Sequence, residues 1–179
     1  MLIFDIETNG LLHNVNTIHC LVIYDTETDQ TLVYNDQAFE RHTDKPAKEP
    51  IVRGIQHLND ADCIIGHNIL SYDIPVISKL HPWFECPAVV VDTLLLSRLY
   101  HPNILDLDKK HTWKGMPLKL YGRHNLESYG YRLRCPKGDF GKDQAWSDWS
   151  QEMEDYCIQD VHLTTNLWNH FQPYLNGSR

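Results

Sequence analysis

The first half of the chain alternates between strand-like and helix-like spacing of its apolar positions. The opening stretch LIFDIET at 2–8 is a short apolar run that ends in acids, which predicts a strand. Residues 19–35 contain two β-rich runs joined by the polar turn TETDQ, the pattern of a hairpin. Apolar residues in IVRGIQHLND, 51–60, have helical spacing. A polar loop with two prolines is expected between them, at 36–50.

The second half continues this alternation. The expected elements are a buried strand at 62–68, a helix at 72–80, a strand leading into a helix at 88–100, a short helix at 125–133 and a long helical tail at 147–175. Proline and glycine predict irregular segments at 101–123 and 134–146. Ser147 is expected to cap the tail, which either runs on unbroken or divides near Asp160.

The resulting order of elements is three strands, a helix, a strand, a helix, a strand and then helices. This order predicts an α/β fold with one mixed five-stranded sheet flanked by helices. The 179 residues fit a single domain of ordinary size, and neither an internal repeat nor a low-complexity linker divides them.

Composition narrows the class of protein. Hydrophobic residues make up 42% and charged residues 22%, as in globular proteins, and no apolar run approaches the ~18 residues of a membrane span. The opening residues do not resemble a secretory signal. The five cysteines form no C-x-x-C pair, and three of them, Cys20, Cys63 and Cys157, sit in apolar runs where buried thiols are expected. We therefore expect a cytoplasmic protein with no membrane partner.

The net charge of −8 argues against a nucleic-acid partner, but the distribution of the charges along the chain weakens this argument. Residues 98–137 carry nine Lys and Arg against three acids, whereas 139–160 carry seven acids against Lys142 alone. A basic segment beside an acidic one suits a protein that holds phosphates near a metal cluster. Two solvated faces of opposite sign would give the same pattern, so charge alone leaves both interpretations open.

Three groups of carboxylates are candidates for chemistry. Asp5 and Glu7 are two residues apart on the first strand, so both side chains point to one face, where two like charges favour a bound cation. Oxygen-only ligands favour a hard ion such as magnesium or manganese. A D-x-E pair is also common on surfaces, so alone it decides nothing.

The second group, His67-Asn68-x-x-x-Tyr72-Asp73, comes directly after the strand residues DCIIG, at a strand-to-helix junction where α/β folds present ligand-binding side chains. Asp73 in this position is equally explained as a helix cap. The third group is Tyr156-x-x-x-Asp160, whose side chains share one face of a helix. A surface acid near a half-buried tyrosine would look the same.

The three groups together, in this order, resemble the DEDD exonuclease superfamily in its tyrosine-bearing branch. The histidine branch carries a His five residues before the last Asp, where this chain has Asp155. The segments VVDTLLLSRLYHP, GRHNLESYGYRLRCPKGDF and EMEDYCIQDV are similar to the proofreading exonuclease domain of family A DNA polymerases from T-seven-type phages. The resemblance implies a ribonuclease H-like fold and a single 3′→5′ exonuclease domain over 1–179.

The resemblance also implies the roles of these residues. Asp5, Glu7 and Asp160 would hold the ion that activates water, and Asp5 would bridge to a second Mg²⁺ or Mn²⁺ supported by Asp73. Tyr156 would orient the attacking water, because a free phenol with a pKa near ~10 is a poor base. The product would be nucleoside 5′-monophosphates.

The expected substrate is the 3′ end of single-stranded DNA, bound through sequence-independent contacts. The expected substrate contacts are Thr8, Leu11, Asn68 and Tyr72. The basic stretch Lys109, Lys110, Lys114 and Lys119 either steers the strand or is a solvated loop.

Several alternatives stay open. The chain could be an excised domain, a separate exonuclease or one half of a split polymerase, and a polymerase domain or subunit is a possible partner. An RNA-trimming exonuclease of the same superfamily and a non-catalytic docking module are the rival functions. An unrelated α/β protein would have to carry all three groups by chance.

Overall fold

The computed structural model describes residues 1–37, 49–87, 89–135 and 146–179. Its strands are β1 (Leu2–Thr8), β2 (Ile18–Asp25), β3 (Gln30–Tyr34), β4 (Cys63–Gly66) and β5 (Val89–Asp92). Its helices are α1 (Ile51–Asn59), α2 (Asp73–Leu80), α3 (Thr93–Tyr100), α4 (Ile104–Lys109), a 3-10 turn η1 (Leu118–Leu120), α5 (Leu126–Arg132) and α6 (Gln151–Leu175).

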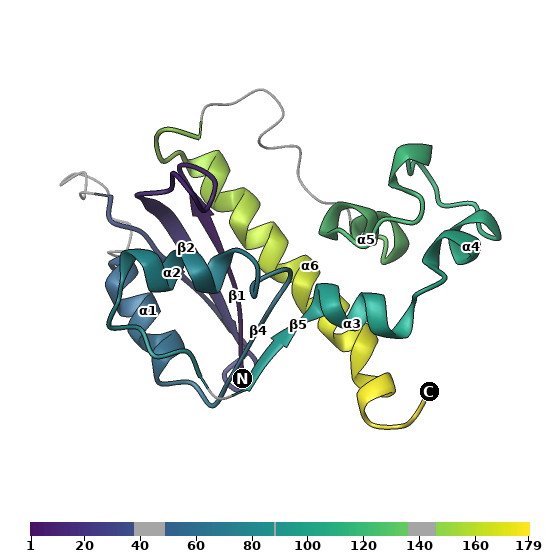
Figure 1. The fold of residues 1–179 in the computed structure, drawn as a ribbon, viewed down its shortest axis with the longest axis horizontal. Coiled ribbons are helices and arrows are strands. Elements are labelled where there is room, and N and C mark those ends of the chain that lie inside the picture. Colours follow the sequence, from purple (N-terminus) through teal and green to yellow (C-terminus); the bar gives the residue numbers. More distant parts are fainter. Residues whose placement is uncertain (38–48, 88, 136–145) are drawn as a thin grey trace.

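The strands form one mixed sheet in the order β3-β2-β1-β4-β5 (Figure 1). The hairpin of β2 and β3 and the β1–β2 pair are antiparallel, whereas β1–β4 and β4–β5 are parallel. This confirms the predicted α/β class and the mixed five-stranded sheet. β1 lies at the centre of the sheet, and β4 ends at Gly66 while β1 continues to Thr8. The carboxyl ends of the parallel strands β1 and β4 therefore lie at the same edge of the sheet, the usual ligand position in α/β folds.

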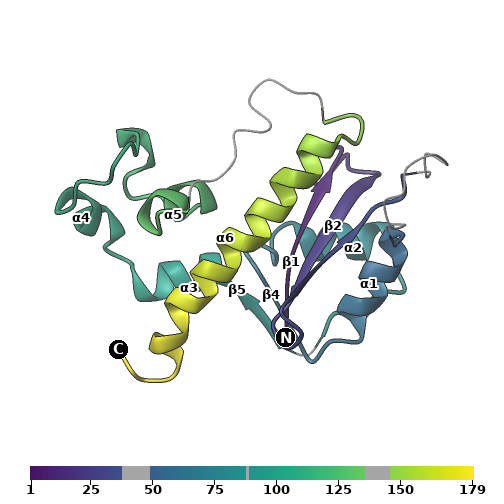
Figure 2. The ribbon, with the colours of Figure 1, turned by 180° about the vertical axis from the view of Figure 1, so that it is seen from behind.

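Each face of the sheet packs against different helices. Leu2, Phe4 and Ile6 alternate along β1 into a core shared with α1 and α2. Ile3 points the other way, into a core that contains Cys157 and Val161 of α6. Figure 2 shows α6 crossing this second face diagonally. Asp5 and Glu7 have the parity of Ile3, so β1 directs both carboxylates toward α6.

A third apolar cluster joins the far end of α6 to the region of α4 and α5, with Leu163, Leu167 and Phe171 on the side of α6. The prediction that 101–123 is irregular was wrong in part, because α4 and η1 form there. The buried carboxylate of Asp108 holds this region together. It accepts two bonds from Arg132, at 3.0 and 2.7 Å, one from Trp113 Nε1 at 3.0 Å and one from the amide of Gly122 at 2.8 Å.

The helical tail is a single helix without a break at Asp160. The expected cap, Ser147, was wrong: its hydroxyl donates to Asp148, and Ser150 caps α6 by accepting from the amide of Met153 at 3.1 Å. The helix stays continuous because its two halves pack against different clusters, the sheet first and the α5 region afterwards.

The remaining expectations have mixed outcomes. Cys20, Cys63 and Cys157 are buried, as predicted. Most of the loops expected at 36–50 and 134–146 lie outside the described residues. Among the helices in the described part of the chain, none has the length and apolar character needed to cross a membrane.

Candidate active site

Two carboxylates and a thiol meet where β1 passes under α6. Glu7 is 8% exposed and Asp5 is partly exposed. The Cys157 thiol donates to the carbonyl oxygen of Asp5 at 3.5 Å and lies 3.6 Å from its carboxylate Oδ2. One ligand atom each from Asp5, Glu7 and Cys157 lie within 4.8 Å of one another. The strand register shifts between Glu7 and Thr8, so β1 becomes irregular directly after the two acids.

Cys157 was expected only as a buried thiol and not as part of this site. Burial, the adjacent Cys20 thiol and the charges of Asp5 and Glu7 raise its pKa well above the ordinary value, so the thiol keeps its proton at neutral pH. The sequence did contain a signal for its placement. Cys157 is three residues before Asp160, which puts both side chains on one face of α6.

Asp73 brings the second motif to the first. It is the first residue of α2, and its Oδ1 accepts a hydrogen bond from the amide of Ile6 at 3.3 Å, between Asp5 and Glu7. The side chain therefore lies against β1 near the carboxyl ends of the parallel strands. The N-cap position itself belongs to Tyr72, which makes no side-chain cap bond. The carboxylate of Asp73 is thus directed at the central strand.

The environment of Asp73 changes its acidity. The residue is only 4% exposed, and this burial, together with the charges of Asp92 and Asp160, raises the pKa of Asp73 to about 7. Hydrogen bonds from its own amide and from Ile6 oppose the shift. The influence of Asp160 on Asp73 means that the third motif lies close to the second.

Asp160 and Tyr156 belong to the half of α6 that crosses the sheet. Asp160 is 5% exposed and Tyr156 is half-buried, and the unbroken helix places both on one face. The structure thus brings Asp5, Glu7, Asp73 and Asp160 to one end of β1. Their predicted roles, like that of Tyr156, stay predictions.

Thr8 and Tyr72 join the loop after β1 to the start of α2. The Tyr72 hydroxyl lies in hydrogen-bonding contact with the Thr8 hydroxyl and donates to the carbonyl of Gly10, to which Thr8 Oγ1 also donates at 3.1 Å. Leu11, at the tip of this loop, is 66% exposed. Of the expected substrate contacts, Thr8 and Tyr72 are thus engaged with the loop, and Leu11 is open to solvent.

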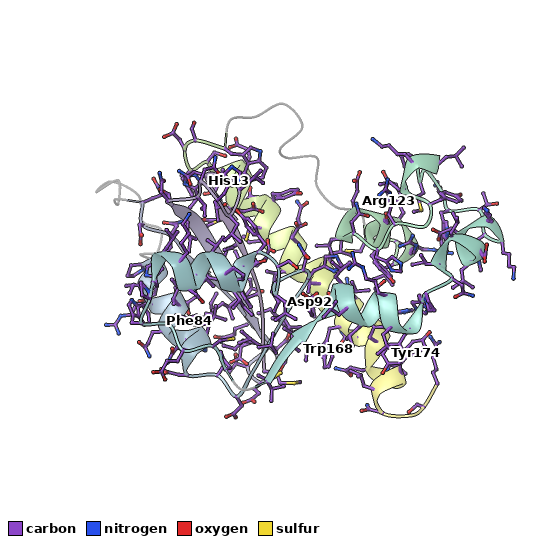
Figure 3. The ribbon with its side chains drawn as sticks, in the orientation of Figure 1. His13, Phe84, Asp92, Arg123, Trp168 and Tyr174 are labelled. Carbon is purple, nitrogen blue, oxygen red and sulfur yellow. The ribbon has the colours of Figure 1, made fainter. Side chains whose placement is uncertain are left out.

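Asp92, which sequence reasoning did not single out, positions the fourth expected contact, Asn68. Its buried carboxylate accepts from the amides of Asn68 at 2.8 Å, Leu70 at 3.2 Å and Leu94 at 2.9 Å. The same side chain therefore caps α3 and holds the loop after β4, and Figure 3 shows it at the junction of sheet and helix. The strand VVV followed by Asp and a helical pattern was the available signal for a cap.

This junction is tied in two further places. Thr93 Oγ1 donates to the carbonyl of Gly66 at 3.1 Å and lies 2.9 Å from Nδ1 of His67. A Cβ at Gly66 would come within 2.2 Å of the Ile69 side chain and 3.0 Å of the Phe4 carbonyl. Only glycine fits this close approach, so the segment that carries Asn68 is fixed against the sheet.

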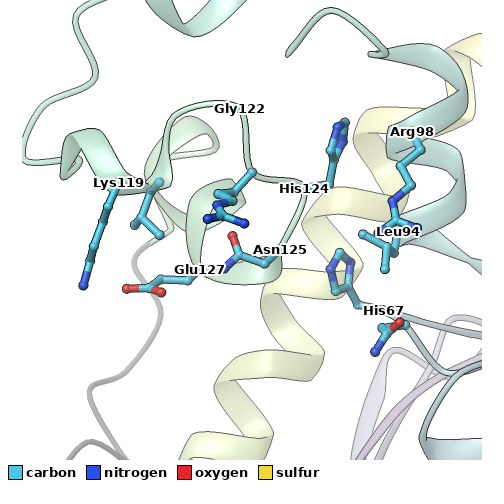
Figure 4. Close-up of a pocket in the computed structure, with 11 residues that line it drawn as sticks. His67, Leu94, Arg98, Lys119, Gly122, His124, Asn125 and Glu127 are labelled. Carbon is cyan, nitrogen blue, oxygen red and sulfur yellow. The ribbon is translucent and has the colours of Figure 1, made fainter. Parts of the chain in front are cut away.

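A cavity of about 760 Å³ has Asn68, one of the expected substrate contacts, in its lining. Figure 4 shows the residues around it. Its wall comes from the loop after β4, from α3 and from the segment 119–127. The lining residues are His67, Asn68, Leu94, Arg98, Lys119, Leu120, Gly122, Arg123, His124, Asn125 and Glu127. Three permanent cations therefore face one acid. Of the basic stretch expected to steer a strand, only Lys119 lines this cavity; Arg98 and Arg123 were not predicted.

The segment 119–127 is held in place by buried polar contacts. Asp108 fixes the amide of Gly122, which has a left-handed φ of 75°. His124 Nδ1 lies 2.6 Å from the Ser97 hydroxyl on α3. Burial and the charges of Arg132 and Arg98 lower the pKa of His124, so its ring is neutral at pH 7. The positive charge of the cavity thus comes from its Arg and Lys side chains.

Comparison with known proteins places this geometry in a family. A model of the RNase H superfamily matches residues 2–172. The chain belongs to the RNase H superfamily. It is 35% identical over 189 residues to a DNA-directed DNA polymerase of Escherichia phage T7, a match that covers 93% of this chain and 26% of the polymerase. A polymerase of Enterobacteria phage T3 matches over the same shares. The chain thus spans about a quarter of the length of these relatives.

Solved structures confirm the RNase H-like fold. A nuclease in its apo form superposes with a TM-score of 0.62 at 18% identity, over 98% of this chain and 74% of the nuclease. The zinc-bound complex of E. coli exonuclease I with single-stranded DNA gives a TM-score of 0.58 at 18% identity, over 99% of this chain and 42% of that protein. At these identities the likeness concerns the fold.

The donor set of this RNase H-like domain fits divalent cations. Asp5 and Glu7 offer oxygen ligands within reach of one ion, the preference of Mg²⁺ and Mn²⁺. Burial is the main cause of the raised pKa of Asp73, and the charges of Asp92 and Asp160 add to it; a cation bound beside these carboxylates would favour their charged forms.

Proposed function

We propose that this chain is a 3′→5′ exonuclease domain of the tyrosine-bearing DEDD type, which hydrolyses single-stranded DNA to nucleoside 5′-monophosphates. The observation that carries the proposal is the gathering of Asp5, Glu7, Asp73 and Asp160, from three separate sequence motifs, at the carboxyl end of β1. The similarity to phage T7 DNA polymerase supports a proofreading role beside a polymerase domain or subunit.

In this proposal Asp5, Glu7, Asp73 and Asp160 would hold two Mg²⁺ or Mn²⁺ ions. The bound ions would supply water activation, charge neutralisation on the phosphate and stabilisation of the leaving 3′ oxygen. Tyr156 orients the attacking water through a hydrogen bond with its phenol. A free phenol has a pKa near ~10, so it is protonated at neutral pH and is a poor base.

The DNA strand approaches past the cavity beside Asn68. Arg98, Lys119 and Arg123 neutralise backbone phosphates there, a contact that is independent of base sequence. The exposed Leu11 packs against the terminal base, and Asn68 contacts its sugar or phosphate. Thr8 and Tyr72 shape the floor of the terminal-nucleotide site through their shared hydrogen bonds. A proofreading site must accept any base sequence, because any 3′ terminus can fray.

A labelled single-stranded DNA, incubated with the protein and Mg²⁺ or Mn²⁺, tests the proposal. A 5′ label should report a ladder that shortens from the 3′ end, and a 3′ label should be released at once as a mononucleotide. Asp5→Ala should lower the rate by several orders of magnitude, since metal stabilisation of the transition state is worth several kcal/mol and ~1.4 kcal/mol is tenfold. Asp62→Ala, which changes an exposed acid away from the site, should cleave normally.

Undiminished cleavage in excess EDTA would overturn the metal-dependent mechanism. A matched RNA strand cut faster than DNA would assign the chain to RNA trimming. Failure of the wild-type protein to cleave either strand, alone or with a polymerase subunit, would favour a docking module.

A further inference from the structure

The carboxylate site contains one donor that the proposed hydrolysis does not use. Cys157 is fully buried on α6, and its thiol is directed at Asp5, with Sγ 3.5 Å from the carbonyl oxygen and 3.6 Å from carboxylate Oδ2. Together with Glu7, these residues offer three possible metal ligands within 4.8 Å of one another. A site whose carboxylates favour hard ions such as Mg²⁺ thus also contains a soft sulfur ligand.

We propose that Cys157 makes this site a mixed oxygen and sulfur site, in which a thiophilic divalent cation such as Zn²⁺ or Cd²⁺ binds Asp5, Glu7 and the Cys157 thiolate and displaces Mg²⁺ or Mn²⁺. The proposal rests on the cation site of the proposed function. It adds a second class of metal ion at this site, and it names Cys157 as the ligand that this class uses and Mg²⁺ or Mn²⁺ does not.

The spacing of the donors fits such an ion. Zinc binds thiolate sulfur at about 2.3 Å and carboxylate oxygen at about 2.0–2.2 Å, usually as a tetrahedron. Two ligands at these lengths, separated by a tetrahedral angle, lie about 3.5–3.7 Å apart. The sulfur of Cys157 and Oδ2 of Asp5 are 3.6 Å apart. The two side chains therefore need little movement to share one ion.

The chemistry of the donors separates the two metal classes. Mg²⁺ and Mn²⁺ prefer oxygen, so with either of them the thiol keeps its proton and its hydrogen bonds to Asp5. A softer ion takes the thiolate. As the sulfur–metal bond forms, the sulfur–hydrogen bond breaks and the proton passes to solvent, with no change of oxidation state.

Cys20 is the rival sulfur donor. It pairs with Glu7 across β1 and β2, and its thiol contributes to the raised pKa of Cys157. It is the informative control, because both thiols are completely buried. Cys157 is the thiol that contacts Asp5, so only the loss of Cys157 should remove the sulfur ligand.

Cadmium titration followed by the ultraviolet thiolate-to-metal absorption band tests the proposal. The double variant C86S/C135S removes the exposed Cys86 and the partly exposed Cys135, which lies 3.6 Å from His162. In this background one equivalent of Cd²⁺ should give the band. Adding Cys157→Ser should abolish the band, and adding Asp5→Asn should weaken cadmium binding. Adding Cys20→Ser should leave the band in place. A band that survives Cys157→Ser, or that Cys20→Ser alone removes, would overturn the proposal.

Electron paramagnetic resonance of Mn²⁺ separates this inference from the proposed function. Cys157→Ser should still bind Mn²⁺, which also shows that it folds, and should need at least ~10-fold more Cd²⁺ than wild type to release it. If wild-type protein binds no Mn²⁺, the proposed function fails. If it binds Mn²⁺ but gives no cadmium–thiolate band, only the assignment of Cys157 fails.

Discussion

The carboxylate of Asp73 accepts a hydrogen bond from the amide of Ile6, 3.3 Å away on the central strand. This bond links the start of α2 to β1 between Asp5 and Glu7, and it explains why an acid is buried where sequence reasoning also allowed a simple helix cap. The buried position of Asp73 raises its pKa, and that shift can be measured.

The first prediction concerns pH. In EDTA, the free energy of unfolding should fall as pH rises through the range between the two pKa values of Asp73 and should level off above it. The pKa of Asp73 is about 7 in the folded protein against an ordinary value of 3.8, so between these values the folded state binds a proton that the unfolded chain has lost. Asp73→Asn should reduce the fall by ~1 kcal/mol or more, as measured by urea unfolding at each pH. Parallel pH dependences for wild type and Asp73→Asn would contradict the assignment.

The second prediction concerns Tyr156. Tyr156→Phe should lower kcat on single-stranded DNA about 10- to 100-fold, because the attacking water loses its orienting hydroxyl. Binding of Mn²⁺ should not change, since the phenol is not a metal ligand in the proposed mechanism. Tyr131→Phe on α5 serves as the control and should be neutral. Loss of Mn²⁺ binding in Tyr156→Phe would instead make the tyrosine part of the metal site.

The third prediction concerns the cavity. Arg98→Ala and Arg123→Ala should each raise KM for single-stranded DNA with little effect on kcat, because in the proposed function these cavity residues contact phosphates remote from the reacting bond. Each should also reduce the slope of log binding constant against log salt by about 0.7. Lys109→Ala, an exposed lysine of α4 outside the cavity lining, provides the comparison. Equal effects of all three variants would mean that the cavity has no special role.

The fourth prediction concerns Asp92. Asp92→Ala should lower the free energy of unfolding by about 2–4 kcal/mol, because the amides of Asn68, Leu70 and Leu94 lose their acceptor. Asp92→Asn keeps one oxygen and should cost less. It also removes a charge that raises the pKa of Asp73, so the pH dependence described above should move to lower pH. An unchanged midpoint in Asp92→Asn would show that the two carboxylates do not interact.

Local periodicity predicted those parts of the site that lie within one element. The spacing of two along β1 placed Asp5 beside Glu7, and the spacing of four along α6 placed Tyr156 beside Asp160. The sheet followed from its alternating elements. These features depend only on backbone geometry and on which face is apolar.

Other features depend on contacts between distant residues and were not predicted. The region of α4 forms around the bidentate pair of Asp108 and Arg132, which are 24 residues apart. Ser150 caps α6 in place of the predicted Ser147, whose hydroxyl donates to Asp148. The cavity is assembled from three segments, so the basic residues that line it could not be separated from those that do not.

The continuity of α6 has a consequence for how this chain can vary. One face near Cys157 and Asp160 meets the carboxylate site, and residues from Leu163 to Phe171 hold the region that forms the cavity wall. Inserting a single residue between these halves would rotate everything beyond it by ~100° and advance it by ~1.5 Å. Substitutions along the helix preserve this phase and length changes do not. The uninterrupted helix therefore fixes the distance between the cavity wall and the carboxylates.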